Sequence, residues 1–365
     1  MNSYKGKNIE FSITGKSHSN SLELTICGLP KNTIVSLDKI KQDLLLRKPK
    51  LFFNTQRNEE DEFNVEGISS FGEIISDKII VSFKNKSFND KPYKANDGFL
   101  RPSHSDYAQF LYSKEIYPGG GEFSGRLTLP LTFIGSIAKQ ILELKGIFIV
   151  SRIKSVYNLS DKELDDESIS LLKNLSLEDK KFPVVSKKFK NNCFKLLENI
   201  KEENDSVGGV IETVVLNTKP GLGGPLFSGL ESKISNLLFG IPAIKGVEFG
   251  DGFSFLNKKG SEVEDEFYLD NGTIKTRNNH NGGINGGVSN GMPIIIRTIV
   301  KPVPTIKKPL TSVNYKTQKE ETVVFDGDHD VFIGNRAIPS IEGMVAVSLL
   351  DELLWKKRKR KKLIW

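Results

Sequence analysis

The chain has 365 residues, of which 38% are hydrophobic, and this is enough to fill a large core. No apolar run is long enough to span a membrane and the N-terminus lacks the apolar stretch of a signal peptide, so we expect a cytoplasmic protein without a membrane partner. The formal net charge is +7, but the run KKRKRKK at 356–362 carries seven positive charges by itself, so the composition predicts no nucleic-acid-binding surface over the rest of the chain.

The first half of the chain contains two clear periodic patterns. Apolar and more polar side chains alternate over residues 22–27, which predicts a strand. Apolar residues recur at helical spacing over 133–142, Gly146 supplies a stop, and 147–150 then has the composition of a strand. These segments predict a mixed architecture of helices and strands.

The second half adds three helical patterns and a change of composition. Residues 160–206 are rich in charged and small polar side chains, and they predict a peripheral insertion with a helical pattern that includes Cys193. Cys27 and Cys193 are far apart and belong to no metal-spaced pair, so we expect reduced thiols and no metal site. Further amphipathic helices are predicted at 226–238 and 341–354.

The four histidines lie in short segments crowded with glycine and small polar residues. Such segments let the backbone approach a ligand closely, and imidazole titrates near neutral pH. The pattern predicts that distant loops assemble into one composite site containing His18, His104, His280 and His329.

The run NNHNGGINGGVSNGMP, which begins at Asn278, precedes a strand-like segment that ends before Lys301. Its glycine pairs permit the backbone approach that binding of a phosphate or a flat ring requires. A glycine-rich hairpin without a ligand is the equal alternative. The cluster GGGEFSG at 119–125 does not match a dinucleotide fingerprint and is weak evidence by itself.

Many short motifs, in one order along the chain, resemble those of the chorismate synthase family. They are SITGKSHS, RKPK, TQRNEED, RPSHSDY, SGRLT, PGLGGPLF, IPAIKGVEFGDGF, GSEVEDE, the glycine run above, KPVPTI and HDVFIGNRAIP. The resemblance implies an α+β fold, a sandwich of helices between antiparallel β-sheets, in a single domain over 1–355 followed by a basic tail over 356–365. The tail is most simply a solvated end, with an interaction arm as the alternative.

The resemblance also implies an activity. Family members convert 5-enolpyruvylshikimate 3-phosphate into chorismate by an anti-1,4 elimination of phosphate, with reduced FMN that is not consumed. The implied assembly is a homotetramer. NADPH is a possible reductant of the flavin, although no dinucleotide motif supports it, and Arg47 matches a position linked to NADPH.

Site residues follow from the matching motifs. The catalytic candidates are His18, near the leaving phosphate, His104, near the flavin N1 and carbonyl, and Asp330, near the flavin N5. The substrate-binding candidates are Arg47, Arg57, Arg101, Arg126 and Arg336. The cofactor-binding candidates are Ser124, Ala243, Gly286, Lys301, Pro302, Val303, Pro304, Thr305, Asp328 and Arg47.

Several residues depart from the family pattern within these motifs. Lys16 replaces an acid, Glu122 and Asp328 replace arginines, Leu127 replaces a glutamate, and Phe53 falls near a usually basic position, while Phe123 replaces a serine. Together the charge changes predict a site two units more negative, although its ligands are anions. A catalytically impaired homologue that keeps the fold and binds flavin or an anion is therefore the alternative to an active enzyme.

Overall fold

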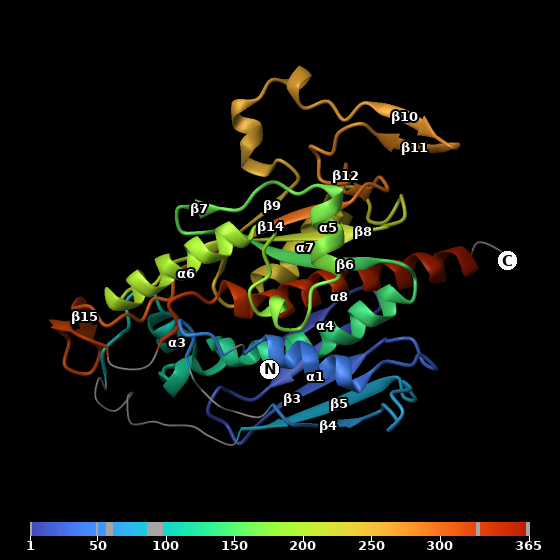
Figure 1. The fold of residues 1–365 in the computed structure, drawn as a ribbon. Coiled ribbons are helices and arrows are strands. Elements are labelled where there is room, and N and C mark those ends of the chain that lie inside the picture. The colour runs from blue at the N-terminus through green and yellow to red at the C-terminus, as the bar shows by residue number, and fades with distance from the viewer. Residues whose placement is uncertain (1, 49, 56–60, 86–97, 326–328, 363–365) are drawn as a thin grey trace.

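The computed structural model describes residues 2–48, 50–55, 61–85, 98–325 and 329–362. Within these ranges the chain forms two five-stranded antiparallel sheets with helices packed between them (Figure 1). This arrangement confirms the predicted α+β sandwich. No described helix has the length and apolar character needed to cross a membrane.

Each sheet presents one apolar face to the helices between them. In the first sheet the predicted strand at 22–27 is confirmed as β3, where Leu22, Leu24 and Ile26 are fully buried. The first sheet has the order β1-β2-β3-β5-β4, with β1 Asn2–Lys5, β2 Glu10–Thr14, β3 Ser21–Cys27, β4 Phe63–Glu66 and β5 Lys78–Lys84. The second has the order β7-β6-β8-β14-β9, with β6 Phe148–Val156, β7 Leu159–Ser160, β8 Gly209–Leu216, β9 Ile244–Phe249 and β14 Ile294–Val300.

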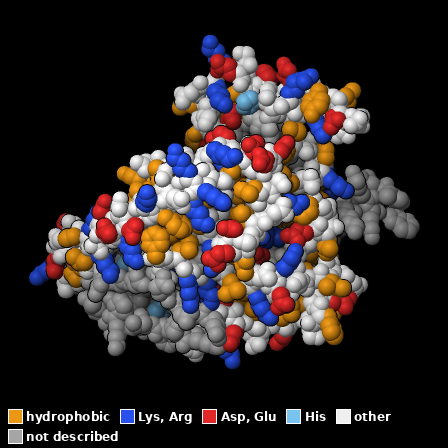
Figure 2. Space-filling view, in the orientation of Figure 1, with side chains coloured by type: hydrophobic (Ala, Val, Ile, Leu, Met, Phe, Trp, Pro, Cys, Tyr) orange, Lys and Arg blue, Asp and Glu red, His pale blue; other side chains and the backbone are white. Residues whose placement is uncertain are grey.

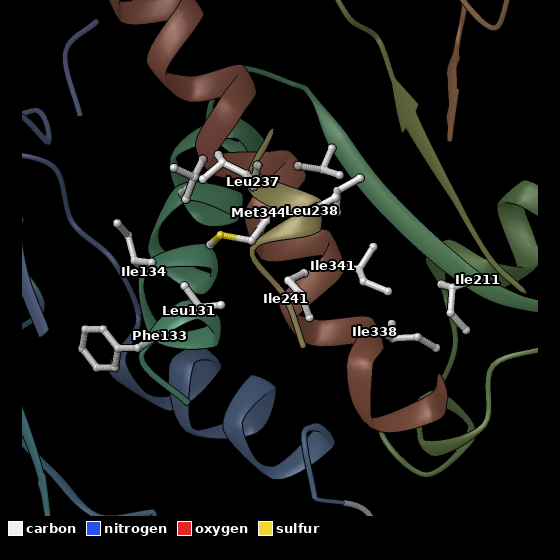
Figure 3. Close-up of a cluster of buried hydrophobic side chains, with 14 of the residues drawn as sticks. Leu131, Phe133, Ile134, Ile211, Leu237, Leu238, Ile241, Ile338, Ile341 and Met344 are labelled. Atoms are coloured by element: carbon white, nitrogen blue, oxygen red, sulfur yellow. The ribbon is translucent and has the colours of Figure 1, made fainter. Parts of the chain in front are cut away.

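The central layer is built on two helices, α4 (Thr128–Glu143) and α8 (Gly334–Lys362). Figure 3 shows apolar side chains of α4, α7 and α8 and Ile211 of β8 converging there, with Met344 among them. The two helices approach so closely that a Cβ on Gly135 would lie 2.2 Å from the Cα of Gly343, so neither position has room for a larger residue. The remaining helices are α1 Leu37–Leu46, α3 Asp106–Ser113, α5 Asp166–Lys173, α6 Lys187–Glu202 and α7 Leu230–Phe239.

Two helix predictions need correction at their N-terminal ends. The helix predicted from residue 226 begins at Leu230, because Leu226 adopts a left-handed φ of 50° in a short turn and is 83% exposed. The helix predicted at 341–354 begins at Gly334, seven residues earlier, and includes Pro339 in its second turn. It also continues to Lys362, so most of the predicted basic tail extends α8.

The segment 160–206 forms α5 and α6 and packs against the second sheet. It contributes Phe182, Phe189, Cys193 and Leu197 to the main core, so its apolar face is integral to the fold. Burial raises the pKa of the Cys193 thiol to about 12, and both cysteines are free. That this segment is an insertion, and that 1–355 is one domain, stay predictions.

Within the described residues, three short hairpins extend from the sandwich or connect its strands. The pair β10–β11 belongs to an arm that projects beyond the second sheet, whereas β12–β13 lies at the base of this arm, where Ile284 and Ser289 are buried (Figure 1). Acidic and basic side chains are interspersed across the face drawn in Figure 2. The strands are β10 Phe267–Asp270, β11 Thr273–Thr276, β12 Ile284–Asn285, β13 Val288–Ser289, β15 Leu310–Asn314 and β16 Lys319–Val323, with β15 and β16 forming a separate pair.

The C-terminal helix also fixes the first turn of the chain. The buried carboxylate of Asp351 accepts hydrogen bonds from the backbone N–H groups of Lys7, Asn8 and Ile9 at 2.9, 2.7 and 2.7 Å. A Cβ on Gly6 would lie 2.7 Å from this carboxylate, so the turn can close over it only with glycine. One side chain on α8 therefore closes the β1–β2 hairpin against the central layer.

We predict that Asp351→Ala lowers the free energy of unfolding by about 3 kcal/mol or more, because three backbone donors lose their acceptor. Asp351→Asn keeps one acceptor oxygen and should cost less. Urea unfolding measures both. Asp77→Ala, whose side chain is 86% exposed, is the control and should change stability by less than about 0.5 kcal/mol. An Asp351→Ala loss as small as the control's would show that water replaces the carboxylate.

Candidate functional site

A turn of three consecutive glycines lies between two of the predicted histidines. Gly119, Gly120 and Gly121 have φ values of 66°, 85° and 54°, all in the left-handed region that favours glycine. A Cβ on Gly119 would lie 2.6 Å from Nε2 of His18, and a Cβ on Gly120 would lie 3.2 Å from Cε1 of His104. The turn therefore brings both imidazoles to one place, although the sequence alone gave this cluster little weight.

Hydrogen bonds fix this glycine turn to the segments on either side. The backbone N–H of Ser17 donates to the carbonyl of Gly121 at 3.1 Å. Gln109 on α3 donates through Nε2 to the carbonyl of Gly120 and accepts from the backbone N–H of Tyr117, at 3.1 and 2.8 Å. Both ends of the turn are therefore anchored by buried or half-buried partners.

His104 is held from its Nδ1 side. This atom lies 2.7 Å from Oδ1 of Asp106, and Arg101 donates through Nε and Nη2 to the same carboxylate at 2.7 and 2.6 Å. Burial would raise the pKa of Asp106, but hydrogen bonds from Arg101 and His104 outweigh it and hold that pKa well below its usual range. Burial lowers the pKa of His104, and the charge of Arg101 adds to this effect.

The loop before His104 is tied to the end of β14. Nζ of Lys301 donates to the carbonyl of Ser103 at 2.6 Å, and Ser103 has a left-handed φ of 59°. The backbone N–H of Lys301 donates to the carbonyl of Ala243 at 3.0 Å. The side chain of Lys301 therefore reaches the His104 loop, while its backbone pairs with Ala243, a second candidate cofactor-binding residue.

The substrate-binding candidates Arg47 and Arg126 converge on a carboxylate that the sequence analysis did not single out. Asp61 accepts from Nη2 of Arg47 at 2.7 Å and from Nη1 of Arg126 at 2.5 Å, and all three side chains are at most 6% exposed. Burial would raise the pKa of Asp61, but the two arginines lower it to about 2. The buried Nε of Arg47 has no hydrogen-bond partner within the described structure.

Asp330 and Arg336 form a second ion pair beside the first. Nη1 of Arg336 lies 2.9 and 2.7 Å from the two oxygens of Asp330, and Thr55 donates its backbone N–H to Asp330 at 3.0 Å. Nε of Arg336 donates to the carbonyl of Arg47 at 3.3 Å. Three of the predicted arginines are therefore brought together.

Asn85 connects this arginine cluster to the His18 loop. Its Oδ1 accepts from Nε of Arg126 at 3.1 Å, and its Nδ2 donates to the carbonyl of Ser19 at 2.6 Å. One side chain consequently joins the arginine cluster to the loop that carries His18. No motif in the sequence analysis singled out Asn85.

Two predicted residues lie elsewhere. Nδ1 of His280 lies 2.7 Å from Oδ2 of Asp251, on the projecting arm near the start of β14. Gly286 lies in the turn of the β12–β13 hairpin, also before β14, whereas Lys301 follows that strand. A seven-residue strand is about 20 Å long, so His280 and the Lys301 contact to the His104 loop lie at opposite ends of β14, and the composite site with all four histidines is wrong for His280 within one chain. The role of Gly286 in cofactor binding stays a prediction.

Two predicted site residues, Arg57 and Asp328, lie outside the described residues. The residues that depart from the family pattern and are described form two groups. Phe53 and Leu127 are buried and belong to the apolar core. Glu122 is half-buried in the glycine turn, while Nζ of Lys16 lies 3.3 Å from the centroid of the Tyr117 ring. Phe123, 40% exposed, packs its ring edge-on against Tyr112.

Comparisons with known proteins cover almost the whole chain. A family model described as chorismate synthase matches residues 9–354. The chorismate synthase of Lancefieldella parvula is 36% identical over 97% of this chain and 96% of its own length, and that of Pyrococcus abyssi is 36% identical over 97% and 98%. A crystal structure of a chorismate synthase matches with a TM-score of 0.75 at 25% identity, covering 96% of this chain and 93% of the other. The chain belongs to the chorismate synthase family.

Proposed function

We propose that this protein is a chorismate synthase that eliminates phosphate from 5-enolpyruvylshikimate 3-phosphate with reduced FMN as cofactor. The observation that carries the proposal is the placement of His18 and His104 on the two sides of one glycine turn, connected through Asn85 to a cluster of arginines. The elimination removes a phosphate and a proton and requires no net redox change. Two positioned imidazoles and a cationic pocket are the groups that such chemistry needs from a protein.

The charge of the arginine cluster suits a substrate with a phosphate and carboxylates. Four cations, Arg47, Lys48, Arg126 and Arg336, surround two carboxylates, Asp61 and Asp330, which leaves 4 − 2 = +2. The unpartnered Nε of Arg47 is a buried donor that an anion can satisfy. We assign Arg47, Arg126 and Arg336 to substrate binding on this basis.

The residues beside His104 suit a bound flavin. Ser124 lies beside the glycine turn and the side chain of Lys301 holds the His104 loop. Lys301 begins the segment 301–305, and its backbone N–H donates to the carbonyl of Ala243. Glycines without Cβ atoms let the imidazoles of His18 and His104 pack against the turn, and a buried imidazole is suited to contact a flat ring. We propose that these residues hold reduced FMN, which supplies the electron-rich ring system for the elimination. Gly286, in the turn of the β12–β13 hairpin, stays a further candidate for cofactor binding.

Each catalytic candidate has a separate task. His18 is assigned to the leaving phosphate, where a proton or positive charge is needed. His104 is assigned to the flavin edge, where burial favours the neutral imidazole. Asp330 is fixed by Arg336 and Thr55 and is assigned to proton movement at the other side of the flavin.

The proposal also includes the oligomeric state of the protein and the source of the electrons that reduce the flavin. We propose a homotetramer in the cytoplasm, with NADPH as a possible reductant. Arg47 is 5% exposed and paired with Asp61, which favours its substrate role over a contact with NADPH. The deciding experiment is anaerobic incubation with chemically reduced FMN and 5-enolpyruvylshikimate 3-phosphate, with chorismate followed by absorbance. Chorismate formation would support an active enzyme, and its absence with a folded, flavin-loaded protein would favour the impaired homologue.

We predict that His18→Ala and His104→Ala each lower turnover about a hundredfold or more in this assay, the usual contribution of a positioned acid or base. His280→Ala is a matched control, because His280 is also paired with an aspartate at 2.7 Å but lies on the arm. Its turnover should stay within about twofold of the parent. Equal losses in all three variants would contradict the assignment.

We predict that Asp61 stabilises the fold in a pH-dependent manner. Its folded pKa of about 2 is below the value of about 3.9 for an unfolded chain, so its contribution is present above pH 4 and is lost as the pH falls towards 2. Asp61→Asn should lower the free energy of unfolding by about 2 to 3 kcal/mol at pH 7, and the difference from the parent should shrink below pH 4. Urea unfolding at a series of pH values tests this, with exposed Asp77→Asn as the control. A difference that is constant with pH would show that charge is not its cause.

We predict that Glu122→Arg tightens reduced FMN about tenfold or more, because the change moves two charge units towards a ligand that carries a phosphate. The gain should decrease with salt if water reaches the pocket. Calorimetric titration measures it, with Glu178→Arg as a control whose parent side chain is 73% exposed on another part of the chain. Unchanged or weaker binding by Glu122→Arg alone would mean that Glu122 does not face the flavin.

A further inference from the structure

Arg101 and Asp106 form a hydrogen-bonded group with His104, an arrangement that substrate binding by Arg101 does not explain. Asp106 is 2% exposed, and its two oxygens accept hydrogen bonds from the backbone N, Nε and Nη2 of Arg101. Oδ1 also lies 2.7 Å from Nδ1 of His104. The carboxylate is therefore surrounded by donors, and the Nε and Nη2 donors of Arg101 are directed at Asp106.

This contact decides which nitrogen of His104 carries the hydrogen. An ionised carboxylate can only accept, so the Nδ1 atom facing it must be the donor. In the neutral imidazole the lone pair then resides on Nε2, which has no hydrogen-bond partner within the described residues. The ideal Cβ position of Gly120 is 3.6 Å from Nε2, on the glycine turn, so the free nitrogen faces the place where both imidazoles meet.

The charges around His104 favour the neutral ring. Arg101 on the preceding loop and Lys301 after β14 both oppose its protonation, and Asp106 at the start of α3 is the acid that supports it. Ser105 places its hydroxyl 3.4 Å from Nδ1. Lys301 also holds the carbonyl of Ser103, whose left-handed backbone directs the chain into His104.

We infer that Asp106 is the positioning residue for His104, and that Arg101 serves the reaction through Asp106 instead of by clamping the substrate. Asp106 fixes the ring with hydrogen on Nδ1 and a lone pair on Nε2, and Arg101 keeps Asp106 in place. This rests on the proposed chorismate synthase activity for its catalytic consequence, but the tautomer itself is a property of the protein alone.

The tautomer is measured directly by long-range 15N–1H NMR on histidine-labelled full-length protein. The chain has only four histidines, and His104→Gln assigns the signal by removing it. We expect His104 to be neutral with hydrogen on Nδ1 at pH 7.5. Asp251→Asn is the matched spectroscopic control, because it breaks a second His–Asp contact of 2.7 Å and should alter only the signals of His280.

Two variants of opposite electrostatic effect separate positioning from a general structural role. Asp106→Asn removes the acceptor charge and should lower the pKa of His104, whereas Arg101→Gln removes the opposing cation and should raise it. Asp106→Asn should also lower kcat about a hundredfold or more, as loss of the orienting aspartate does in the serine-protease triad, with the KM for substrate within about threefold. If that variant does not fold, the parent spectrum and Arg101→Gln still decide the question.

The outcomes are distinct. A His104 ring with hydrogen on Nε2, pKa shifts of the same sign in both variants, or a KM increase without loss of kcat in Arg101→Gln would each overturn the inference. A parent protein with the expected tautomer and shifts but no chorismate formation would sink the proposed function and leave the positioning of His104 by Asp106 intact.

Discussion

The site depends on one backbone constraint, the three consecutive left-handed residues at 119–121. Only glycine adopts these conformations without strain, and only glycine leaves room for an imidazole at 2.6 Å from a would-be Cβ. The turn is anchored to α3 through Gln109 and to the His18 loop through Ser17. Because α4 begins shortly after it, the helix that organises the core also sets the position of the turn. The packing of the helices between the sheets therefore sets how far apart the imidazoles of His18 and His104 lie.

Charge is the second requirement, and the protein meets it at a cost in desolvation. Burying Arg47 and Arg126 at 6% side-chain exposure is unfavourable unless an acid accompanies them, and Asp61 supplies it. An apolar replacement of all three would fill the space without that penalty but would leave no cation for an anion to meet. The retained net positive charge suits the proposed anionic substrate, and Asp61 is the partner that stabilises the buried cations when no ligand is bound.

Hydrophobic periodicity predicted the strands and helices whose formation depends on neighbouring residues along the chain. The alternation at 22–27 and the helical spacing at 133–142 were confirmed because each segment buries one face against the core. The helix predicted from Leu226 was wrong at its first turn, because the backbone at that residue is left-handed and its side chain lies in solvent. The His280 error has a similar origin: glycine-rich neighbours indicate backbone freedom and carry no information on where in the fold a loop lies. Asp61, Asn85 and Asp106 were missed because a buried acid or amide has the same sequence signature as an exposed one, and only long-range contacts distinguish them.

The departures from the family pattern have a different meaning once they are placed in the fold. Phe53 and Leu127 are core residues, where an uncharged side chain is favoured by burial. Lys16 and Glu122 are the two charge reversals that remain within the described part of the site, and they have opposite signs. They also flank a hydrogen bond between the neighbouring residues Ser17 and Gly121, so the two reversals occur on adjacent segments. A gain of two charge units on one segment and a loss of two on the other leave the sum unchanged. Within the described residues the site thus keeps the positive balance that an anionic substrate requires.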